Sequence, residues 1–276
     1  MLLPSYVCSA PLHAIHYTGA TPVFVDVDPE TGNIDPSDLK RRLTPKSKAV
    51  VAVHLFGMVA DMESILSMGI SVLEDCAQAL GAGIGPRRAG ALGHMSITSF
   101  YATKLMTTGE GGMVFSGHEP FMSKARDLAE YDKRDDFRVR FNYKMTDIEA
   151  AMGRCQLAKL DAFLEKRIFL ARAYDEWLGP LPCRLPPSPD GRVYHRYVIG
   201  IDGNVQDIID KLNNRGIEAA RPIFRPLHTY FGLAGYPGAE KCWKQHLSLP
   251  LHPGLCVEDI EEICGALEGA LEETGK

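Results

Sequence analysis

The sequence has no excess of positive charge. Its 30 Lys and Arg residues are outnumbered by 35 Asp and Glu residues, and the formal net charge is -5. Basic residues do gather in two short runs, 133–140 and 215–225. Such runs are typical of solvated faces, although one of them would suffice for a small anionic ligand. The overall balance argues against nucleic acid as the main partner.

Cysteine lacks the spacing of a disulfide framework or a zinc site. The seven cysteines are scattered, their number is odd, and no CxxC pair occurs. Reduced thiols in the cytosol fit this pattern better than either site. The start of the sequence shows no basic segment followed by a long apolar run, and no apolar stretch approaches membrane-spanning length. We therefore expect a cytoplasmic protein without a membrane segment or a metal site.

Three common motifs are also missing. The sequence contains neither the phosphate loop GxxxxGK[ST] nor the GxGxxG fingerprint, which removes support for nucleotide hydrolysis and for dinucleotide redox chemistry. It contains no HExxH metal motif, no internal repeat and no low-complexity tract.

Short apolar strands alternate with helical patterns over the first two thirds of the sequence. The helices are expected to begin after Asp35 and Asp61, which are suitable N-cap residues. Strands that are apolar throughout and separated by helices indicate a mostly parallel sheet covered on both faces, and thus an α/β fold. The expected elements are strands at 23–27, 49–54 and 71–74 and helices at 36–42 and 61–68.

Two further strands, 96–101 and 113–116, are expected on either side of a glycine-rich loop. Helices are then predicted at 119–131 and 145–177. Thr146 and Glu149 fit the T-x-x-E capping box at the start of the second helix. Its length and amphipathic spacing predict a helix that connects two lobes.

The composition shifts near residue 178, where five prolines between 180 and 189 indicate a linker. Beyond it we expect a small α+β domain, in which Gly216 ends a helix in a left-handed cap. We therefore predict a large domain over 1–178 and a small domain over 179–276. The expected elements of the small domain are strands at 195–201 and 247–251 and helices at 205–214 and 257–273.

Asp75 stands at the end of an apolar strand of the expected parallel sheet. Ligands of such sheets bind beyond the carboxyl ends of the strands. A carboxylate placed there can hold a proton on a heterocyclic nitrogen, as pyridoxal phosphate (PLP) requires of its protein. Taken alone, Asp75 is better explained as a cap for the turn that follows.

Lys104 lies in a stretch with little other charge. A lysine that is partly desolvated has a lowered pKa, and its free amine can react with an aldehyde. The hydroxyl of Ser99, five residues earlier, is suited to bind a phosphate, and the glycines between 109 and 112 indicate positive φ angles and a close backbone approach. The alternatives are a surface lysine, a strand serine and a simple hairpin.

Together these segments resemble the DegT/StrS-type sugar aminotransferases, which are fold-type I PLP enzymes. The segments occur in the family's order over the whole chain, and the one around Lys104 is the most specific. They are Pro4-Ser5-Tyr6, 22–28, 33–36, His54-Leu55-Phe56-Gly57, 74–79, 99–104, 109–112, 142–147 and 249–253. The resemblance implies a three-layer large domain like that of aspartate aminotransferase, a small C-terminal domain and a homodimer.

The resemblance also implies roles for individual residues. Lys104 would form the Schiff base with PLP and later move protons. Asp75 would pair with the pyridine nitrogen, Gln78 would hydrogen-bond the ring oxygen beside the aldehyde, and Ala77 would pack on the ring face. The remaining implied roles are phosphate binding for Ser99, a contact with the neighbouring subunit's cofactor for Asn142, and a substrate contact for His228, for which packing is nearly as good an explanation.

Lys104 distinguishes activities within the family, because relatives with histidine at this position dehydrate sugars. The implied activity is therefore transfer of an amino group, typically from glutamate, to a keto sugar nucleotide for polysaccharide or secondary-metabolite synthesis. The family's usual first fifth to quarter, with its phosphate loop, has no counterpart in this sequence. We expect a truncation, rather than a portion supplied by another chain or a degenerate protein. An inactive PLP-fold subunit and a cysteine desulfurase are the alternatives, but no cysteine is obviously placed for the latter.

Overall fold

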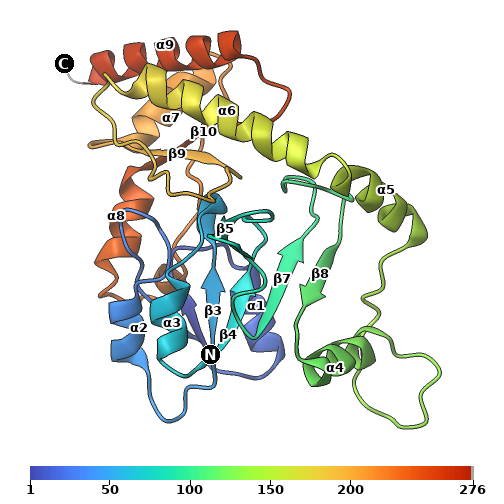
Figure 1. Ribbon diagram of the computed structural model, residues 1–276. Helices are drawn as coiled ribbons and strands as arrows, with labels where there is room; N and C mark the ends of the chain where they lie inside the picture. Colours follow the sequence, from blue (N-terminus) through green and yellow to red (C-terminus); the bar gives the residue numbers. More distant parts are fainter. Residues whose placement is uncertain (275–276) are drawn as a thin grey trace.

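A six-stranded sheet lies at the centre of the computed structural model, which describes residues 1–274 (Figure 1). Its strands stand in the spatial order β2-β1-β3-β4-β7-β8. All neighbouring strands are parallel except β8, which pairs with β7 in the antiparallel sense. The prediction of a mostly parallel sheet is therefore confirmed. The strands are β1 (Leu2–Pro4), β2 (Val23–Val25), β3 (Ala49–Val53), β4 (Ser71–Asp75), β7 (Met95–Ser99) and β8 (Gly112–Phe115).

Helices cover both faces of this sheet because successive strand residues point to opposite sides. On one face, Leu3, Phe24 and Val51 pack with residues of α1 (Ala10–Tyr17) and α8 (Pro237–Gln245). On the other face, Leu2, Val25 and Val50 pack with residues of α2 (Pro36–Arg42) and α3 (Met62–Ser67). The result is the expected three-layer α/β arrangement, with α2 and α3 on the opposite side from α1 (Figure 1).

The predicted starts of α2 and α3 are confirmed. The side chain of Asp35 accepts a hydrogen bond from the backbone N–H of Ser37 at 2.8 Å, and that of Asp61 accepts one from the backbone N–H of Ser64 at 3.1 Å. Helix α8 was not predicted from the sequence. The helix starts with Pro237 and Gly238, a pair that is typical of turns.

The predicted single helix over 145–177 is wrong. The segment forms two helices, α5 (Asp147–Leu157) and α6 (Leu160–Leu178), which follow α4 (Glu119–Ala129). The capping box of Thr146 and Glu149 is present at the start of α5. Residues of α6 are buried in two cores, whereas none of α5 is buried. The apolar spacing continues across Ala158 and Lys159 without proline or glycine, so the sequence contains no signal for the break.

The C-terminal part has a core of its own, between helices and a two-stranded antiparallel sheet. Leu170 and Tyr174 from the second half of α6 belong to this core, whereas Leu160 and Leu164 from its first half pack with residues of the large part. Gly216 has φ +80°, as its predicted cap requires. The elements are β9 (Tyr197–Gly200), α7 (Val205–Asn214), β10 (His246–Leu249) and α9 (Val257–Thr274).

Hydrogen bonds donated by backbone N–H groups hold the C-terminal part to the large sheet at two places. The buried carboxylate of Asp26 accepts the N–H groups of Gly238 and Ala239 at 2.9 and 2.8 Å, and the N–H of Val193 donates to the carbonyl of Gly57 at 3.0 Å. The arrows of β3 and β7 point toward the part that contains α6, α7 and α9 (Figure 1). The carboxyl ends of the parallel strands therefore face the C-terminal part.

Candidate active site

Asp75 lies at the carboxyl end of β4 and is only 8% exposed. Its Oδ1 accepts the backbone N–H of Ala77 at 3.0 Å, whereas its Oδ2 accepts no hydrogen bond within residues 1–274. Burial raises the pKa of this carboxyl, and the bond from Ala77 and the charge of Lys104 oppose that rise. Asp75 thus offers one free acceptor oxygen at the edge where parallel sheets bind ligands.

The loop between β7 and β8 presents Lys104. Phe100 anchors its two ends, because its N–H donates to the carbonyl of Gly111 at 2.9 Å and its carbonyl accepts the N–H of Thr108 at 2.9 Å. Gly111 has φ +142°, and Gly109 has φ +84°, so the expected positive φ angles of the glycine loop are confirmed. The two residues after Lys104 are buried in a hydrophobic cluster, which fixes the loop to the body of the protein.

The surroundings of Lys104 favour its uncharged amine. Burial is the main cause that lowers the pKa of Lys104, and the charge of Arg196 lowers it further, while Cys8 and Asp75 act in the opposite direction. No carboxylate lies within 4 Å of the ammonium group among the described residues, so no ion pair holds the charge. A half-buried lysine in this state is suited to attack an aldehyde carbon.

Gln78 and Ser99 each keep a donor free near the carboxyl ends of β4 and β7. The Oε1 of Gln78 accepts the N–H of Phe56 at 3.0 Å, and its Nε2 makes no hydrogen bond within the described chain. Phe56 has φ +54°, a conformation that a bulky residue adopts only under constraint. The Oγ of Ser99 accepts the N–H of Tyr101 at 3.3 Å, which leaves the hydroxyl proton available.

The structure does not bring the other two predicted site residues to Lys104. Asn142 is exposed and pairs through its backbone with Glu130, just after α4. His228 is 1% exposed, its Nδ1 lies 2.6 Å from the Oγ of Ser5, and its ring stacks on that of Tyr236. These contacts are those of a packing histidine, and its substrate role stays a prediction.

Comparison with known proteins agrees with this geometry. The profile of the DegT/DnrJ/EryC1/StrS aminotransferase family matches residues 1–268. The chain is 36% identical to a GDP-perosamine synthase from Caulobacter vibrioides, covering 98% of this chain and 79% of that protein. The chain belongs to this aminotransferase family.

Two further relatives support the assignment. This chain is 31% identical to a UDP-N-acetyl-3-dehydro-alpha-D-glucosamine 3-aminotransferase from Acidithiobacillus ferrooxidans, covering 98% of this chain and 77% of that protein. The crystal structure of the aminotransferase TlmJ from Streptoalloteichus hindustanus superposes with a TM-score of 0.92 at 31% identity, covering 100% of this chain and 80% of that one.

The chain is accordingly a PLP-dependent transaminase. The free groups of the site fit this cofactor. PLP carries a protonated ring nitrogen, a ring oxygen, a phosphate and an aldehyde. The site offers one free acceptor on Asp75, free donors on Gln78 and Ser99, and an amine on Lys104 whose pKa is lowered by burial.

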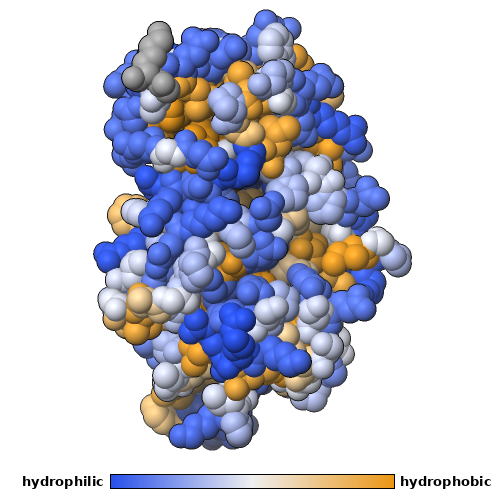
Figure 2. Space-filling model, turned by 90° about the vertical axis from the view of Figure 1, so that its left-hand side faces the viewer, coloured by the Kyte–Doolittle hydropathy of each residue, from blue (hydrophilic) through white to orange (hydrophobic). Residues whose placement is uncertain are grey.

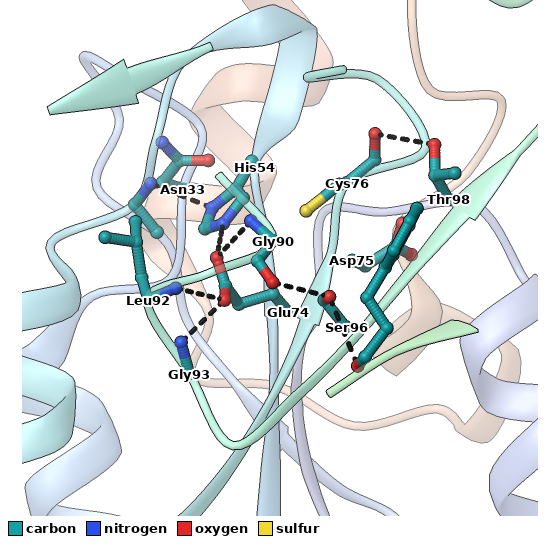
Figure 3. A network of polar contacts seen from close by, with 12 residues as sticks. Asn33, His54, Glu74, Asp75, Cys76, Gly90, Leu92, Gly93, Ser96 and Thr98 are labelled. Carbon is teal, nitrogen blue, oxygen red and sulfur yellow. Dashed lines mark hydrogen bonds and ion pairs between the residues drawn. The ribbon is translucent and has the colours of Figure 1, made fainter. Parts of the chain in front are cut away.

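A fully bonded network lies directly behind Asp75, on the other face of β4 (Figure 3). The carboxylate of Glu74 is buried and accepts four hydrogen bonds. The Nε2 of His54 donates at 2.9 Å, and the N–H groups of Gly90, Leu92 and Gly93 donate at 2.8, 2.8 and 2.6 Å. The network fastens the turn before β7 to the end of β4.

The protonation of this network follows from its bonds. The Nδ1 of His54 accepts the N–H of Ala60 at 3.2 Å, so the ring is neutral and carries its proton on Nε2. Burial raises the pKa of Glu74, but the hydrogen bonds from His54, Gly93 and Gly90 outweigh this and lower it overall. Cys76 lies close enough for the three side chains to hold a metal ion, yet the carboxylate and the imidazole are already saturated by the protein. We interpret the cluster as a structural network that holds the end of β4, where Asp75 lies, in place.

Sequence reasoning missed three residues near Lys104. The charges of Cys8 and Arg196 act on its pKa, and its own charge acts on His195. His195 and Arg196 precede β9, and Cys8 follows β1. These segments meet only because the C-terminal part folds over the carboxyl edge of the sheet, and nothing in their spacing indicates it.

Proposed function

We propose that this aminotransferase moves an amino group from an amino acid, glutamate, to the keto group of a sugar nucleotide. The support comes from the family and from two relatives whose names refer to a GDP-linked and a UDP-linked amino sugar. The two names differ in the nucleotide, and the assay below therefore includes both kinds of substrate. Synthesis of a surface polysaccharide or of a secondary metabolite is the proposed context.

The observation that carries the proposal is the placement of Lys104. It combines a pKa lowered by burial with a free carboxylate oxygen on Asp75, at the edge of the sheet where ligands bind. When bound, PLP supplies an aldehyde that takes up the amino group and a ring that withdraws electrons. In this proposal the Nζ of Lys104 would hold the aldehyde carbon of the cofactor, with the aldehyde oxygen leaving as water. Once an incoming amine has displaced it, the same Nζ would carry a proton to and from the substrate carbon.

The other residues of the proposed site orient the cofactor. The free Oδ2 of Asp75 would accept a hydrogen bond from the protonated ring nitrogen and stabilise its positive charge. The Nε2 of Gln78 would donate to the ring oxygen, Ala77 would pack against the ring face, and the hydroxyl of Ser99 would donate to the phosphate. A substrate contact of His228 would require its hydrogen bond with Ser5 to break.

We further propose a homodimer in which Asn142 reaches the partner's cofactor. Large apolar side chains are exposed around this residue, including Phe137 at 99% and Ile148 at 77% exposure, and no residue of α4 or α5 is buried. Exposed large apolar side chains of this kind are typical of surfaces that bind a partner. The opposite side of the molecule, seen in Figure 2, is mainly hydrophilic with separate apolar patches.

The proposed organisation keeps the two predicted domains, 1–178 and 179–276, joined by α6, which packs in the cores of both. Within residues 1–274, no helix has the length and apolar character needed to span a membrane. We propose that the enzyme works in the cytoplasm, where sugar nucleotides are made.

A product assay tests the proposed function. The purified chain is given PLP, L-glutamate and a panel of GDP- and UDP-linked keto sugars, and amino sugar and 2-oxoglutarate are measured by mass spectrometry. We expect one class of keto sugar to be aminated in equal amount to the 2-oxoglutarate formed. Lys104→Ala should abolish both products, whereas Lys48→Ala, at an exposed position, should not. Cofactor-loaded protein that forms 2-oxoglutarate but aminates no keto sugar nucleotide would contradict the substrate class.

A further inference from the structure

Phe56 is a buried residue whose backbone conformation is unusual for an aromatic side chain. Its φ and ψ are +54° and +20°, and it is 3% exposed. Within residues 1–274, the one other non-glycine residue with a positive φ is Lys133, which is exposed. A bulky residue keeps such a conformation only where the surrounding structure holds it, and positions of this kind are often functional.

Phe56 is the second residue of a tight turn over residues 55–58. The N–H of Met58 donates to the carbonyl of Leu55 at 3.0 Å, and Gly57 has φ +93°. Two successive positive φ angles with this hydrogen bond are typical of a type I′ turn, in which Asn, Asp or Gly is the usual second residue. An aromatic residue therefore stands where a small residue would be free of strain.

Asn33 and the C-terminal part hold this turn from two sides. The Oδ1 of Asn33 accepts the N–H of Leu55 at 2.9 Å, and its Nδ2 donates to the carbonyl of Met58 at 3.1 Å. The N–H of Val193 donates to the carbonyl of Gly57 at 3.0 Å. A Cβ on Gly57 would lie 2.0 Å from the carbonyl oxygen of Val193, so only glycine permits this close approach.

The ring of Phe56 gives the turn a third support. It lies edge-on to the rings of Tyr6 and His246, with centroids 6.5 and 6.3 Å away. The hydroxyl of Tyr6 and the Nδ1 of His246 are 3.2 Å apart. Burial lowers the pKa of His246 to about 4, so this ring brings no charge into the cluster at neutral pH. The aromatic cluster thus anchors the strained residue in the core.

The left-handed conformation directs the N–H of Phe56 to the side chain of Gln78. This N–H donates to Oε1 at 3.0 Å. A backbone N–H is only a donor, so it pairs with the oxygen of the amide and not with its nitrogen. The bond therefore fixes which way round the amide stands, and Nε2 is the end that stays free within the described chain.

We propose that Phe56 is a positioning residue, whose strained backbone holds the Gln78 amide with its donor available to the cofactor. This inference rests on the proposed function, because it concerns the hydrogen bond from Nε2 to the ring oxygen of PLP. An amide that could turn over would present Oε1 to that oxygen in some molecules, and two acceptors repel each other. The turn removes this alternative before the cofactor binds, which lowers the cost of ordering the side chain on binding.

Three substitutions of Phe56 separate its backbone conformation from the packing of its ring. Alanine removes the ring and is strained at positive φ, whereas glycine removes the ring but adopts positive φ freely, and asparagine tolerates it. Phe56→Gly and Phe56→Asn should therefore keep the bond to Gln78, and Phe56→Ala should lose it. A role in packing alone predicts that Phe56→Gly is at least as defective as Phe56→Ala, because glycine leaves the larger cavity.

Hydrogen exchange of the residue 56 amide, measured by NMR on the full chain without cofactor, reads this bond directly. Exchange should be slow in the wild type, Phe56→Gly and Phe56→Asn. It should be about 10-fold faster in Phe56→Ala and in Gln78→Leu, as for the loss of one hydrogen bond. The amides of β3 show whether each variant is still folded. Exchange in Phe56→Gly that is as fast as in Phe56→Ala would overturn the proposal.

A pH titration of the cofactor-loaded chain tests the consequence for PLP. The absorption band of the bound cofactor shifts when the proton beside the ring oxygen is lost, and a donor to that oxygen lowers the pKa of this change. The midpoint should rise by about one pH unit in Gln78→Leu and Phe56→Ala and stay at the wild-type value in Phe56→Gly. Phe24→Ala, which removes a similarly buried ring from the same core cluster, should leave it unchanged.

The outcomes separate this inference from the proposed function. A midpoint that did not move in Phe56→Ala, or that moved equally in Phe24→Ala, would overturn the positioning role. An unchanged midpoint in Gln78→Leu would overturn it as well, because Gln78 would then have no donor to position. Neither measurement uses a keto sugar nucleotide, so failure of the product assay together with the expected midpoints would support the role of Phe56 and remove only the proposed substrate class.

Discussion

Two groups of buried polar residues lie on either side of the same strand end, and they differ in how far the protein satisfies them. Glu74 and His54 have every acceptor and donor paired within the chain. Asp75, Lys104 and the nearby His195 leave polar atoms without partners among residues 1–274. Adjacent residues of a strand face opposite sides, so one step along β4 leads from a structural network to a ligand site.

Residue type alone does not distinguish the two groups. Glu74 and Asp75 are neighbouring buried acids, yet the pKa of the first is lowered by its hydrogen bonds and that of the second is raised by burial. A saturated carboxylate stabilises the fold, whereas a carboxylate with a free oxygen is available for a bound group. Substitutions at the two positions should therefore affect different properties of the protein.

The largest effect is expected for Asp75→Asn. The change removes the negative charge that favours a protonated ring nitrogen, and we expect kcat to fall by roughly 100- to 10,000-fold, as for the loss of a group that positions a proton. The free energy of unfolding should change by less than about 1 kcal/mol, because Asp75 Oδ2 has no partner within the described residues to lose. Steady-state kinetics and urea unfolding of the same preparations measure both.

Glu74→Gln should show the opposite pattern. The amide cannot accept all four hydrogen bonds of the carboxylate, and we expect the free energy of unfolding to fall by roughly 2–4 kcal/mol. Activity of the folded fraction should change much less than in Asp75→Asn. Glu63→Gln, on an exposed position of α3, is the matched control and should cost less than about 0.5 kcal/mol. If Glu74→Gln were as stable as this control, the network would not support the strand end.

A smaller effect is expected from pH. The pKa of Glu74 is lower in the folded chain than in the unfolded chain, so its contribution to stability is complete above the unfolded pKa and is lost as pH falls through the folded value. The difference in unfolding free energy between wild type and Glu74→Gln should therefore shrink as the medium is acidified below about pH 4. Urea unfolding at a series of pH values checks this, and a difference that grew on acidification would contradict the protonation state assigned here.

Much of this architecture could be predicted because it depends on local sequence. The alternation of apolar strands with helices that follow Asp35 and Asp61 is enough to indicate the parallel sheet. The order of Asp75, Ser99 and Lys104 indicates a cofactor edge only together with the other segments that resemble the family, because each of the three residues alone has a simpler explanation.

The remaining features depend on contacts between distant segments. The break between α5 and α6 follows from burial of only the second helix, which the apolar spacing does not reveal. His195 and Arg196 reach Lys104 only because bonds such as that between Val193 and Gly57 set the C-terminal part over the sheet. The saturation of Glu74 depends on three N–H groups of a turn that follows it by 16 to 19 residues.

Reductive trapping tests the central claim, that Lys104 is the residue to which the cofactor binds. The full chain is incubated with PLP, reduced with sodium borohydride and digested, and the peptides are analysed by mass spectrometry. We predict one modified peptide, with the cofactor on Lys104, and no modification at that peptide after treatment of Lys104→Ala. Labelling spread over exposed lysines such as Lys48, with Lys104 unmodified, would contradict the account.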